Sequence, residues 1–249
     1  DYVGKLRKGY TLNLILVGCE FAGKTTLANE IVEWSKRTLG RYSHFHDHFT
    51  IPSTELEGDA REEYRRSSPQ IKEMFQRFMM NYHMSPDFYD NVDHHLMGFH
   101  IEEAVYAPLY YGYGGENSGS PFRSAKGQRT EMARHMEEII LERAPNVMLV
   151  MLHATPEVIR QRMAAPKDNR TAPRDSEPFG PPTARVVQDG DVEFVLDRFD
   201  EEFRNSLIQN RFTLDTSTAT IDETMAEFVK NAVPLLSTED RHQIEGTRA

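Results

Sequence analysis

The 249-residue sequence predicts an α/β fold in which helices cover both faces of a parallel sheet. Residues 12–18 read LNLILVG, a short apolar run ending in glycine that is typical of a strand buried on both faces. Strand-like and helix-like patterns alternate about five times along the chain, which favours parallel strands joined by helical crossovers. No internal repeat and no second domain are evident, so we expect one domain over residues 1–249.

The first half of the chain predicts three strands and the helices between them. After a strand at residues 12–17, residues 25–37 carry the apolar stripe of an amphipathic helix. A second strand is expected at residues 42–47 and a third at residues 95–99, which form the apolar run of that region. A helical stretch begins near residue 59, and its later part places four apolar side chains at helical spacing. We expect these four to be buried: Ile71, Phe75, Phe78 and Met79.

Further elements follow a segment at residues 110–124 that is rich in tyrosine, glycine and serine. The spacing of methionine and isoleucine predicts a helix around residues 132–140, and residues 147–152 form the clearest strand after the first. Thr155 followed by Pro156 is typical of a helix start, because threonine caps the helix and proline fits its first position.

The last part of the chain begins with a loop that is rich in proline. Five prolines and several basic residues are spread over residues 164–183, and no regular element is expected to survive that spacing. Apolar stripes then predict helices at about residues 192–203 and 221–229, with a short strand at residues 212–215 between them. The predicted sheet therefore has five strands.

Composition narrows the classes of function. The mean hydropathy is -0.60, and the apolar run at residues 12–17 is far shorter than the roughly 20 residues that cross a bilayer. We therefore expect a cytoplasmic protein without a membrane partner, and the single cysteine, Cys19, fits a reducing compartment. The net charge of -10 argues against a general nucleic-acid-binding surface. The expected partner is a small molecule, and a homodimer is left open.

Residues 18–25 read GCEFAGKT and match the pattern G-x-x-x-x-G-K-[ST] directly between a buried strand and a helix. Glycines let the backbone wrap around phosphate oxygens, and the helix N-terminus supplies positive potential. Lys24 is then expected to neutralise the β- and γ-phosphates of ATP, and the Thr25 hydroxyl to ligate Mg²⁺. The residues expected to contact the nucleotide are Gly18, Glu20, Phe21, Ala22, Gly23, Lys24, Thr25 and Thr26.

Several features occur in one order along the chain: GKTT at the end of the loop, an acidic residue after the second strand, a VY segment after the third, an arginine-bearing loop and a closing TLDTS. This order resembles the thymidylate kinase and deoxynucleoside kinase superfamily. The resemblance implies a three-layer P-loop NTPase fold with a five-stranded parallel sheet. It also implies that a lid, here about residues 164–183, closes over ATP. The implied activity is ATP-dependent transfer of the γ-phosphoryl group to a nucleoside or a nucleoside monophosphate.

The segment HIEEAVY at residues 100–106 departs from this family's pattern. The family begins the corresponding segment with an Asp-Arg pair, which here falls on Met97 and Gly98. Glu102 and Glu103 are placed to bind a Mg²⁺-bound water or a substrate hydroxyl. Acidic residues at a helix start also complement the helix dipole, so both interpretations stay open.

Asp47 lies at the carboxyl end of the expected second strand, where ligands bind in open α/β sheets. The resemblance implies that an acid there orients or deprotonates an acceptor hydroxyl, and a cap on a turn is the alternative. Lid arginines would stabilise the charge that spreads over the transferred phosphoryl group, unless they are simply solvated. Arg160 and Arg162 are second choices for that role. The expected catalytic residues are Lys24, Asp47, Arg170 and Arg174.

The acceptor is expected between the loop after the second strand and the helix that begins near residue 59. An aromatic face there would stack on a base, and an arginine would hold a monophosphate, although buried aromatics also serve core packing. The expected substrate contacts are Phe49, Arg61, Tyr64, Arg65, Glu103 and Tyr106.

Two other functions remain open from the sequence. The missing Asp-Arg pair allows a kinase with a non-nucleosidic acceptor on the same scaffold. A nucleotide-dependent ATPase or switch is the third hypothesis, although an acid for Mg²⁺ at the third strand and a hydrolysis signature are not clear.

Overall fold

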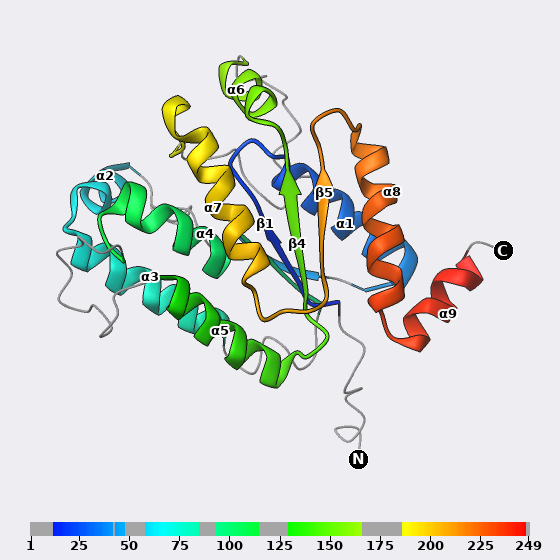
Figure 1. Ribbon diagram of the computed structural model, residues 1–249. Coiled ribbons are helices and arrows are strands. Elements are labelled where there is room, and N and C mark those ends of the chain that lie inside the picture. Colours follow the sequence, from blue (N-terminus) through cyan, green and yellow to red (C-terminus); the bar gives the residue numbers. More distant parts are fainter. Residues whose placement is uncertain are drawn as a thin grey trace.

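The structure is a computed structural model, and it describes residues 12–41, 43–47, 58–84, 93–114, 129–165 and 186–247. Within these ranges five strands form one sheet in the order β2-β3-β1-β4-β5, and each neighbouring pair is parallel. The strands are β1 (Leu14–Val17), β2 (Ser43–Asp47), β3 (Asp93–Met97), β4 (Met148–His153) and β5 (Arg211–Asp215). The prediction of an α/β fold with a parallel sheet between helices is confirmed (Figure 1).

Helices cover both faces of this sheet (Figure 1). On one face, α1 (Lys24–Leu39) packs against α8 (Ile221–Ala232) and α9 (Thr238–Thr247). On the other face, α4 (Phe99–Tyr106) packs against α5 (Arg129–Arg143) and α7 (Val192–Arg204). The remaining elements are α2 (Gly58–Arg66), α3 (Pro69–His83), α6 (Pro156–Ala164) and the short turns η2 (Ala107–Tyr111), η3 (Asp189–Asp191) and η4 (Val233–Leu235). In the described part of the chain, no helix combines the length and the apolar character needed to span a membrane.

The central strands are buried because helices lie on both of their faces. Every residue of β1 and β3 is buried, and so is every residue of β4 except the last. β5 lies at one edge of the sheet and is only partly buried. The apolar run at the start of the sequence therefore forms the middle of the core, as its composition predicts.

The start of α6 follows the predicted local signal. The Thr155 side chain accepts a hydrogen bond from the Val158 N–H (3.4 Å), and Pro156 is the first residue of α6. Thr220 and Glu223 form a reciprocal capping box at the start of α8. The apolar stripe predicted for α7 is buried in full: Val192, Leu196, Phe199 and Phe203.

The orientation of α3 differs from the prediction. The side chains of Ile71 and Phe78 are 49% and 67% exposed, so their predicted burial is wrong. Four large apolar residues share this exposed face: Ile71, Met74, Phe78 and Tyr82. The opposite, polar face turns inward because Glu73 forms a buried ion pair with Arg129 of α5.

The polar start of β3 is also buried, and the strand begins two residues before its predicted position. Asp93 accepts hydrogen bonds from the Leu12 N–H (2.6 Å), the Ser35 hydroxyl (3.3 Å) and Arg41 Nε (3.1 Å). Arg41 in turn binds Asp240 at 2.8 Å. Asp240 lies on α9, a helix that was not predicted from the sequence. These donors satisfy the carboxylate, which makes its burial tolerable.

Candidate nucleotide-binding site

The glycine-rich loop at residues 18–25 joins β1 to α1 at the carboxyl end of the sheet. Gly18 has φ 140°, and a Cβ there would lie 2.4 Å from the Leu152 carbonyl oxygen of β4, so a side chain does not fit. Gly23 has φ 97° and precedes α1, whose start is not capped by any described side chain. The first-turn N–H groups of α1 are therefore available to an anion.

The Lys24 ammonium lies inside this loop. Its Nζ donates hydrogen bonds to the Gly18 carbonyl (2.5 Å) and the Cys19 carbonyl (3.2 Å), and it lies 2.8 Å from Glu102 Oε1. Burial alone would lower the pKa of Lys24, but the Glu102 carboxylate outweighs it and holds that pKa above its ordinary value. Lys24 is thus charged at neutral pH.

The acid beside Lys24 comes from the first turn of α4. Gly98 has φ 81°, and its N–H donates to the Leu16 carbonyl (2.7 Å), so the chain turns sharply at the end of β3. α4 begins immediately at Phe99, which brings Glu102 over the end of β1 with only 5% of its surface exposed. Glu102 and Glu103 were both candidates from the sequence, but the predicted substrate contact was Glu103.

Two side chains beside the loop carry oxygen donors of the kinds that Mg²⁺ prefers. The Thr25 hydroxyl donates a weak hydrogen bond to Met97 Sδ (3.9 Å) at the end of β3. Together, Thr25 and Glu102 offer a hydroxyl and a carboxylate, the donor types that Mg²⁺ prefers, with phosphates and water left to complete its shell. In the ranges that the structure describes, no group of three or more histidine, cysteine or acidic side chains is arranged to hold a metal.

Asp47, the predicted base, ends β2 and pairs in register with Met97. Its backbone therefore lies at the edge of the sheet that carries the phosphate loop. Its side chain is outside the described residues, as are Phe49, Arg170, Arg174 and the side chain of Arg61. The roles assigned to these five residues stay predictions.

Tyr106 and Glu20 hold the outer part of the loop. The Tyr106 hydroxyl accepts a hydrogen bond from the Glu20 N–H (3.0 Å), and the buried Tyr106 ring packs edge-on against Phe199. The Glu20 carboxylate accepts the N–H groups of Val186 (2.9 Å) and Val187 (3.0 Å). Both residues were predicted to contact ligands, and the structure places them where they support the loop.

Arg162 and Thr216 also hold the loop in place, although neither was predicted to contact it. Arg162 of α6 donates to the Phe21 carbonyl (3.0 Å) and to the Thr216 carbonyl (2.5 Å) after β5. The Thr216 hydroxyl donates to the Ala22 carbonyl (2.9 Å). The TLDTS segment contained this threonine, but only its contact with the loop reveals what it does. Arg160 instead binds Glu193 at 2.5 Å, away from the loop.

The described acceptor candidates of α2, Tyr64 and Arg65, make contacts within α2 and with α3. The Tyr64 ring packs against Phe75 (centroids 5.0 Å apart), and its hydroxyl donates to the Lys72 carbonyl (3.4 Å), which joins α2 to α3. Arg65 pairs with Glu62 (2.9 Å) on the surface. Their roles in binding an acceptor stay predictions.

Glu103 faces away from Lys24 into a buried cluster. It accepts a hydrogen bond from the Tyr113 hydroxyl (3.3 Å) and lies 3.7 Å from Arg129 Nη1. Arg129 also pairs with Glu73 and lies 4.9 Å from the centre of the Tyr113 ring. Burial raises the pKa of Glu103, although Arg129 opposes this shift. The cluster joins α3, α4 and α5, and the predicted substrate contact of Glu103 stays a prediction.

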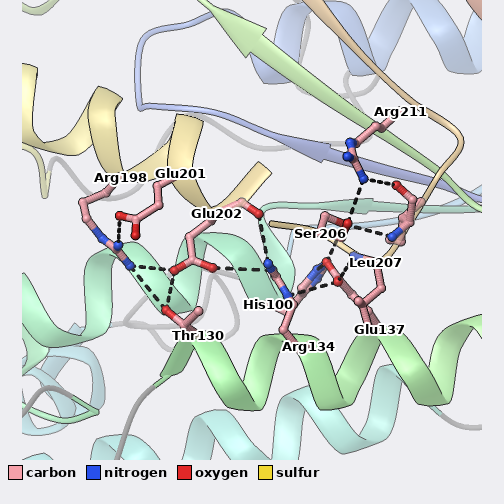
Figure 2. A network of polar contacts seen from close by, with 11 residues as sticks. His100, Thr130, Arg134, Glu137, Arg198, Glu201, Glu202, Ser206, Leu207 and Arg211 are labelled. Carbon is pink, nitrogen blue, oxygen red and sulfur yellow. Dashed lines mark hydrogen bonds and ion pairs between the residues drawn. The ribbon is translucent and has the colours of Figure 1, made fainter. Parts of the chain in front are cut away.

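A buried polar network fixes α4, the helix that carries Glu102 (Figure 2). His100 Nε2 lies 2.8 Å from Glu137 Oε1 of α5. Glu137 also accepts hydrogen bonds from the Ser206 hydroxyl (2.8 Å) and the Leu207 N–H (2.7 Å). Burial alone would raise the pKa of Glu137, but the contacts with His100 and the Leu207 amide outweigh it and lower that pKa. The network therefore contains an ionised carboxylate, and removing it would leave the Ser206 hydroxyl and the Leu207 N–H without their acceptor.

No family model matches the chain, and no curated protein matches it. Solved structures do match. Thymidylate kinase from Ehrlichia chaffeensis is 11% identical with a TM-score of 0.50, and the match covers 89% of this chain and 98% of that one.

Two others match with lower TM-scores. Thymidylate kinase from Candida albicans is 15% identical with a TM-score of 0.47, covering 90% of this chain and 95% of that one. A sugar kinase from Janibacter sp. HTCC2649 is 13% identical with a TM-score of 0.41, and the match covers 88% of this chain and 93% of that one. Of these three structures, the Ehrlichia kinase has a TM-score of 0.50 and the other two fall below that value. Together with the strand order and the loop, it shows that the chain has a P-loop nucleotide kinase-like fold.

Proposed function

We propose that this protein is an ATP- and Mg²⁺-dependent phosphotransferase that passes the γ-phosphoryl group to a nucleoside or nucleoside monophosphate. The observation that carries the proposal is the phosphate loop itself, with Lys24 held 2.8 Å from Glu102 at the carboxyl edge of a parallel sheet. The likeness in fold to a thymidylate kinase supports the acceptor class.

The chemistry needs positioning and charge stabilisation more than covalent steps. The loop amides and the start of α1 are placed for phosphate oxygens, and Lys24 can exchange its loop carbonyls for the β- and γ-phosphates. Thr25 and Glu102 are the residues that would hold Mg²⁺, which neutralises charge on the phosphates when bound.

The acceptor side is proposed from positions in the fold and along the chain. Asp47 is the proposed base because its backbone lies at the edge shared with Met97 and the phosphate loop. Arg170 and Arg174 are proposed to close over the transferred group. We retain Tyr64 and Glu103 as proposed contacts of the acceptor.

One observation favours a non-nucleosidic acceptor as the second candidate. Met97 and Gly98 occupy the position of the family's Asp-Arg pair, and Met97 contacts the Thr25 hydroxyl instead of presenting a charge. An acceptor such as a sugar or another hydroxyl metabolite would not need that pair.

The expected partners follow from charge and remain proposals. The net charge of -10 supports a small-molecule acceptor over a nucleic acid. We likewise propose a cytoplasmic location, no membrane partner and a homodimer. Sedimentation of the full chain measures the oligomeric state.

The test is release of ADP from Mg²⁺-ATP with a panel of nucleosides, nucleoside monophosphates, sugars and other hydroxyl compounds. We expect release that depends on one nucleosidic acceptor, with little release when no acceptor is added. Dependence on a sugar would select the second candidate. Release that is the same with and without every acceptor would contradict a kinase and indicate an ATPase or switch.

A further inference from the structure

The corner of the phosphate loop at Phe21 has an unusual backbone. Phe21 has φ 68°, in the left-handed region that a bulky residue rarely adopts. Such a conformation costs free energy and persists only where neighbouring groups hold it. Here the Phe21 carbonyl accepts a hydrogen bond from Arg162 Nη1 (3.0 Å). The Ala22 N–H, at the other end of the same peptide plane, donates to the Cys19 carbonyl (3.1 Å).

The next peptide plane is held by Thr216, the buried residue that follows β5. Its hydroxyl donates to the Ala22 carbonyl (2.9 Å) and accepts a hydrogen bond from Arg162 Nη1 (3.2 Å). A trans peptide is rigid, and its C=O and N–H point in opposite directions. Because the Ala22 carbonyl faces Thr216, the Gly23 N–H faces away from Thr216 at the start of α1. It is there one of the amides that such a loop offers to an anion.

One guanidinium thus connects both peptide planes. Arg162 donates to the Phe21 carbonyl, to the Thr216 hydroxyl and to the Thr216 carbonyl (2.5 Å). The planar fork of an arginine can serve several acceptors at once, and it has no acceptor of its own to compete with them. The Thr216 oxygen is therefore the acceptor in their contact, which leaves its hydrogen for a carbonyl group.

We propose that Arg162 and Thr216 are positioning residues for the triphosphate: they fix the Phe21 and Ala22 carbonyls, and thereby aim the loop amides at the phosphates, without contacting the nucleotide themselves. The inference rests on the proposed function, because it requires a triphosphate in the loop. It extends that proposal by naming side chains outside the loop that set its affinity for phosphate.

The experiment is isothermal titration of two probes into the full chain in excess Mg²⁺, without an acceptor. The probes are ATP and inorganic tripolyphosphate, which has the phosphates but no base or sugar. In Arg162→Gln we expect both probes to bind about tenfold weaker, because the loop loses the hydrogen bonds that hold its shape. A loss confined to ATP would mean that Arg162 contacts the nucleoside, and it would overturn the inference.

Arg160 provides a matched control for charge. It lies on the same helix and also donates to a backbone carbonyl, that of Asp189 (3.2 Å), but it binds Glu193 instead of the loop. Arg160→Gln removes the same charge and should leave the affinity for both probes unchanged. An equal loss in Arg160→Gln and Arg162→Gln would show that net charge sets the affinity, and it would overturn the inference.

Thr216 tests the same idea without a change of charge. Thr216→Val removes the hydroxyl and keeps the shape of the side chain, so both probes should bind about tenfold weaker. Thr216→Ser keeps the hydroxyl and should bind them within about threefold of the wild type. Because a purely structural role would not distinguish the phosphates from other ligands, urea unfolding of each variant is measured beside its affinity.

The outcomes separate the inference from the proposed function. Unchanged binding in Arg162→Gln and Thr216→Val would overturn the inference while leaving the nucleotide site intact. If the wild type binds neither probe, the nucleotide site and the inference fail together. Binding of ATP without tripolyphosphate would mean that the loop does not hold phosphates by itself, and it would also overturn the inference. Should Arg162→Gln fold poorly by circular dichroism, the two Thr216 variants decide, and equal affinities in them would overturn it.

Discussion

Two ion pairs, each with a buried carboxylate, lie at opposite edges of the parallel sheet, where its strands start and where they end, and they differ in what holds them. At the amino edge, Asp93 binds Arg41 and also accepts the Leu12 N–H, so it joins three segments whose backbones are fixed by the fold. At the carboxyl edge, Glu102 binds Lys24, whose long side chain also donates to carbonyl groups of the phosphate loop.

The difference shows how one kind of contact serves two purposes. The Leu12 N–H reaches Asp93 from the backbone, so this contact cannot change without moving the chain, and its loss is a loss of stability. The Lys24 ammonium can exchange its partners by rotating side-chain bonds, so its contacts can give way to a ligand. An ion pair alone therefore does not indicate a functional site; the two pairs differ in that Asp93 holds a backbone N–H of the core, whereas Lys24 holds carbonyl groups of the loop.

The largest effect is expected at the carboxyl edge. Lys24→Ala should lower acceptor-dependent ADP release by about a hundredfold to a thousandfold, because it removes a preorganised charge from the transition state. Lys36→Ala, which changes an exposed lysine near the other end of α1, is the control and should retain activity. Turnover by Lys24→Ala within about tenfold of the wild type would exclude the phosphate role.

At the amino edge the expected effect is on stability. Asp93→Ala should lower the free energy of unfolding by about 3 kcal/mol, since it leaves Arg41 and the Leu12 N–H without their buried acceptor. Urea unfolding measures this loss, and Asp197→Ala on the exposed face of α7 is the control. The affinity for Mg²⁺-ATP should not change once the variant is folded; a large change would mean that the two edges are coupled.

The pH dependence of stability sharpens the comparison. Burial raises the pKa of Asp93 in the folded state, although Arg41 opposes the shift. The folded protein thus binds this proton more tightly than the unfolded chain, so the contribution to stability is complete below about pH 4 and is lost as the pH rises through the folded pKa. Because asparagine does not titrate, the stability gap between wild type and Asp93→Asn should shrink from about pH 4 to pH 7. A gap that widens over this range would contradict the raised pKa.

The smallest effect is expected for the stability of Glu102→Gln. The substitution should cost about 1 kcal/mol or less, because Lys24 keeps the Gly18 and Cys19 carbonyls as acceptors. Thermal and urea unfolding measure the change. A loss as large as that of Asp93→Ala would place Glu102 among the structural ion pairs and remove the contrast between the edges.

Local patterns account for much of the agreement between sequence and structure. The apolar run of β1, the glycine-rich loop and the capping threonine of α6 are each determined by neighbours in the chain, so they are readable without tertiary contacts. The apolar stripe of α7 is likewise a property of one helix, and it is buried as predicted.

Contacts between distant segments explain the failures. The sequence of α3 carries apolar side chains on more than one side, and Ile71 and Phe78 face outward because contacts with other elements, among them the ion pair between Glu73 and Arg129, hold the opposite face inward. The start of β3 looks too polar for a central strand, and Asp93 is tolerated there because donors from the segment before β1, from α1 and from the segment before β2 bind its carboxylate.

Motif and periodicity are local, so the sequence alone places a glycine-rich loop between a buried strand and a helix, and acidic residues after the third strand. It did not determine which acid meets the loop. Glu102 and Glu103 are adjacent on a helix and point about 100° apart. The turn at Gly98 and the packing of α4 against α5 and α7 direct Glu102 to Lys24 and Glu103 to Arg129, a choice made by the tertiary structure alone.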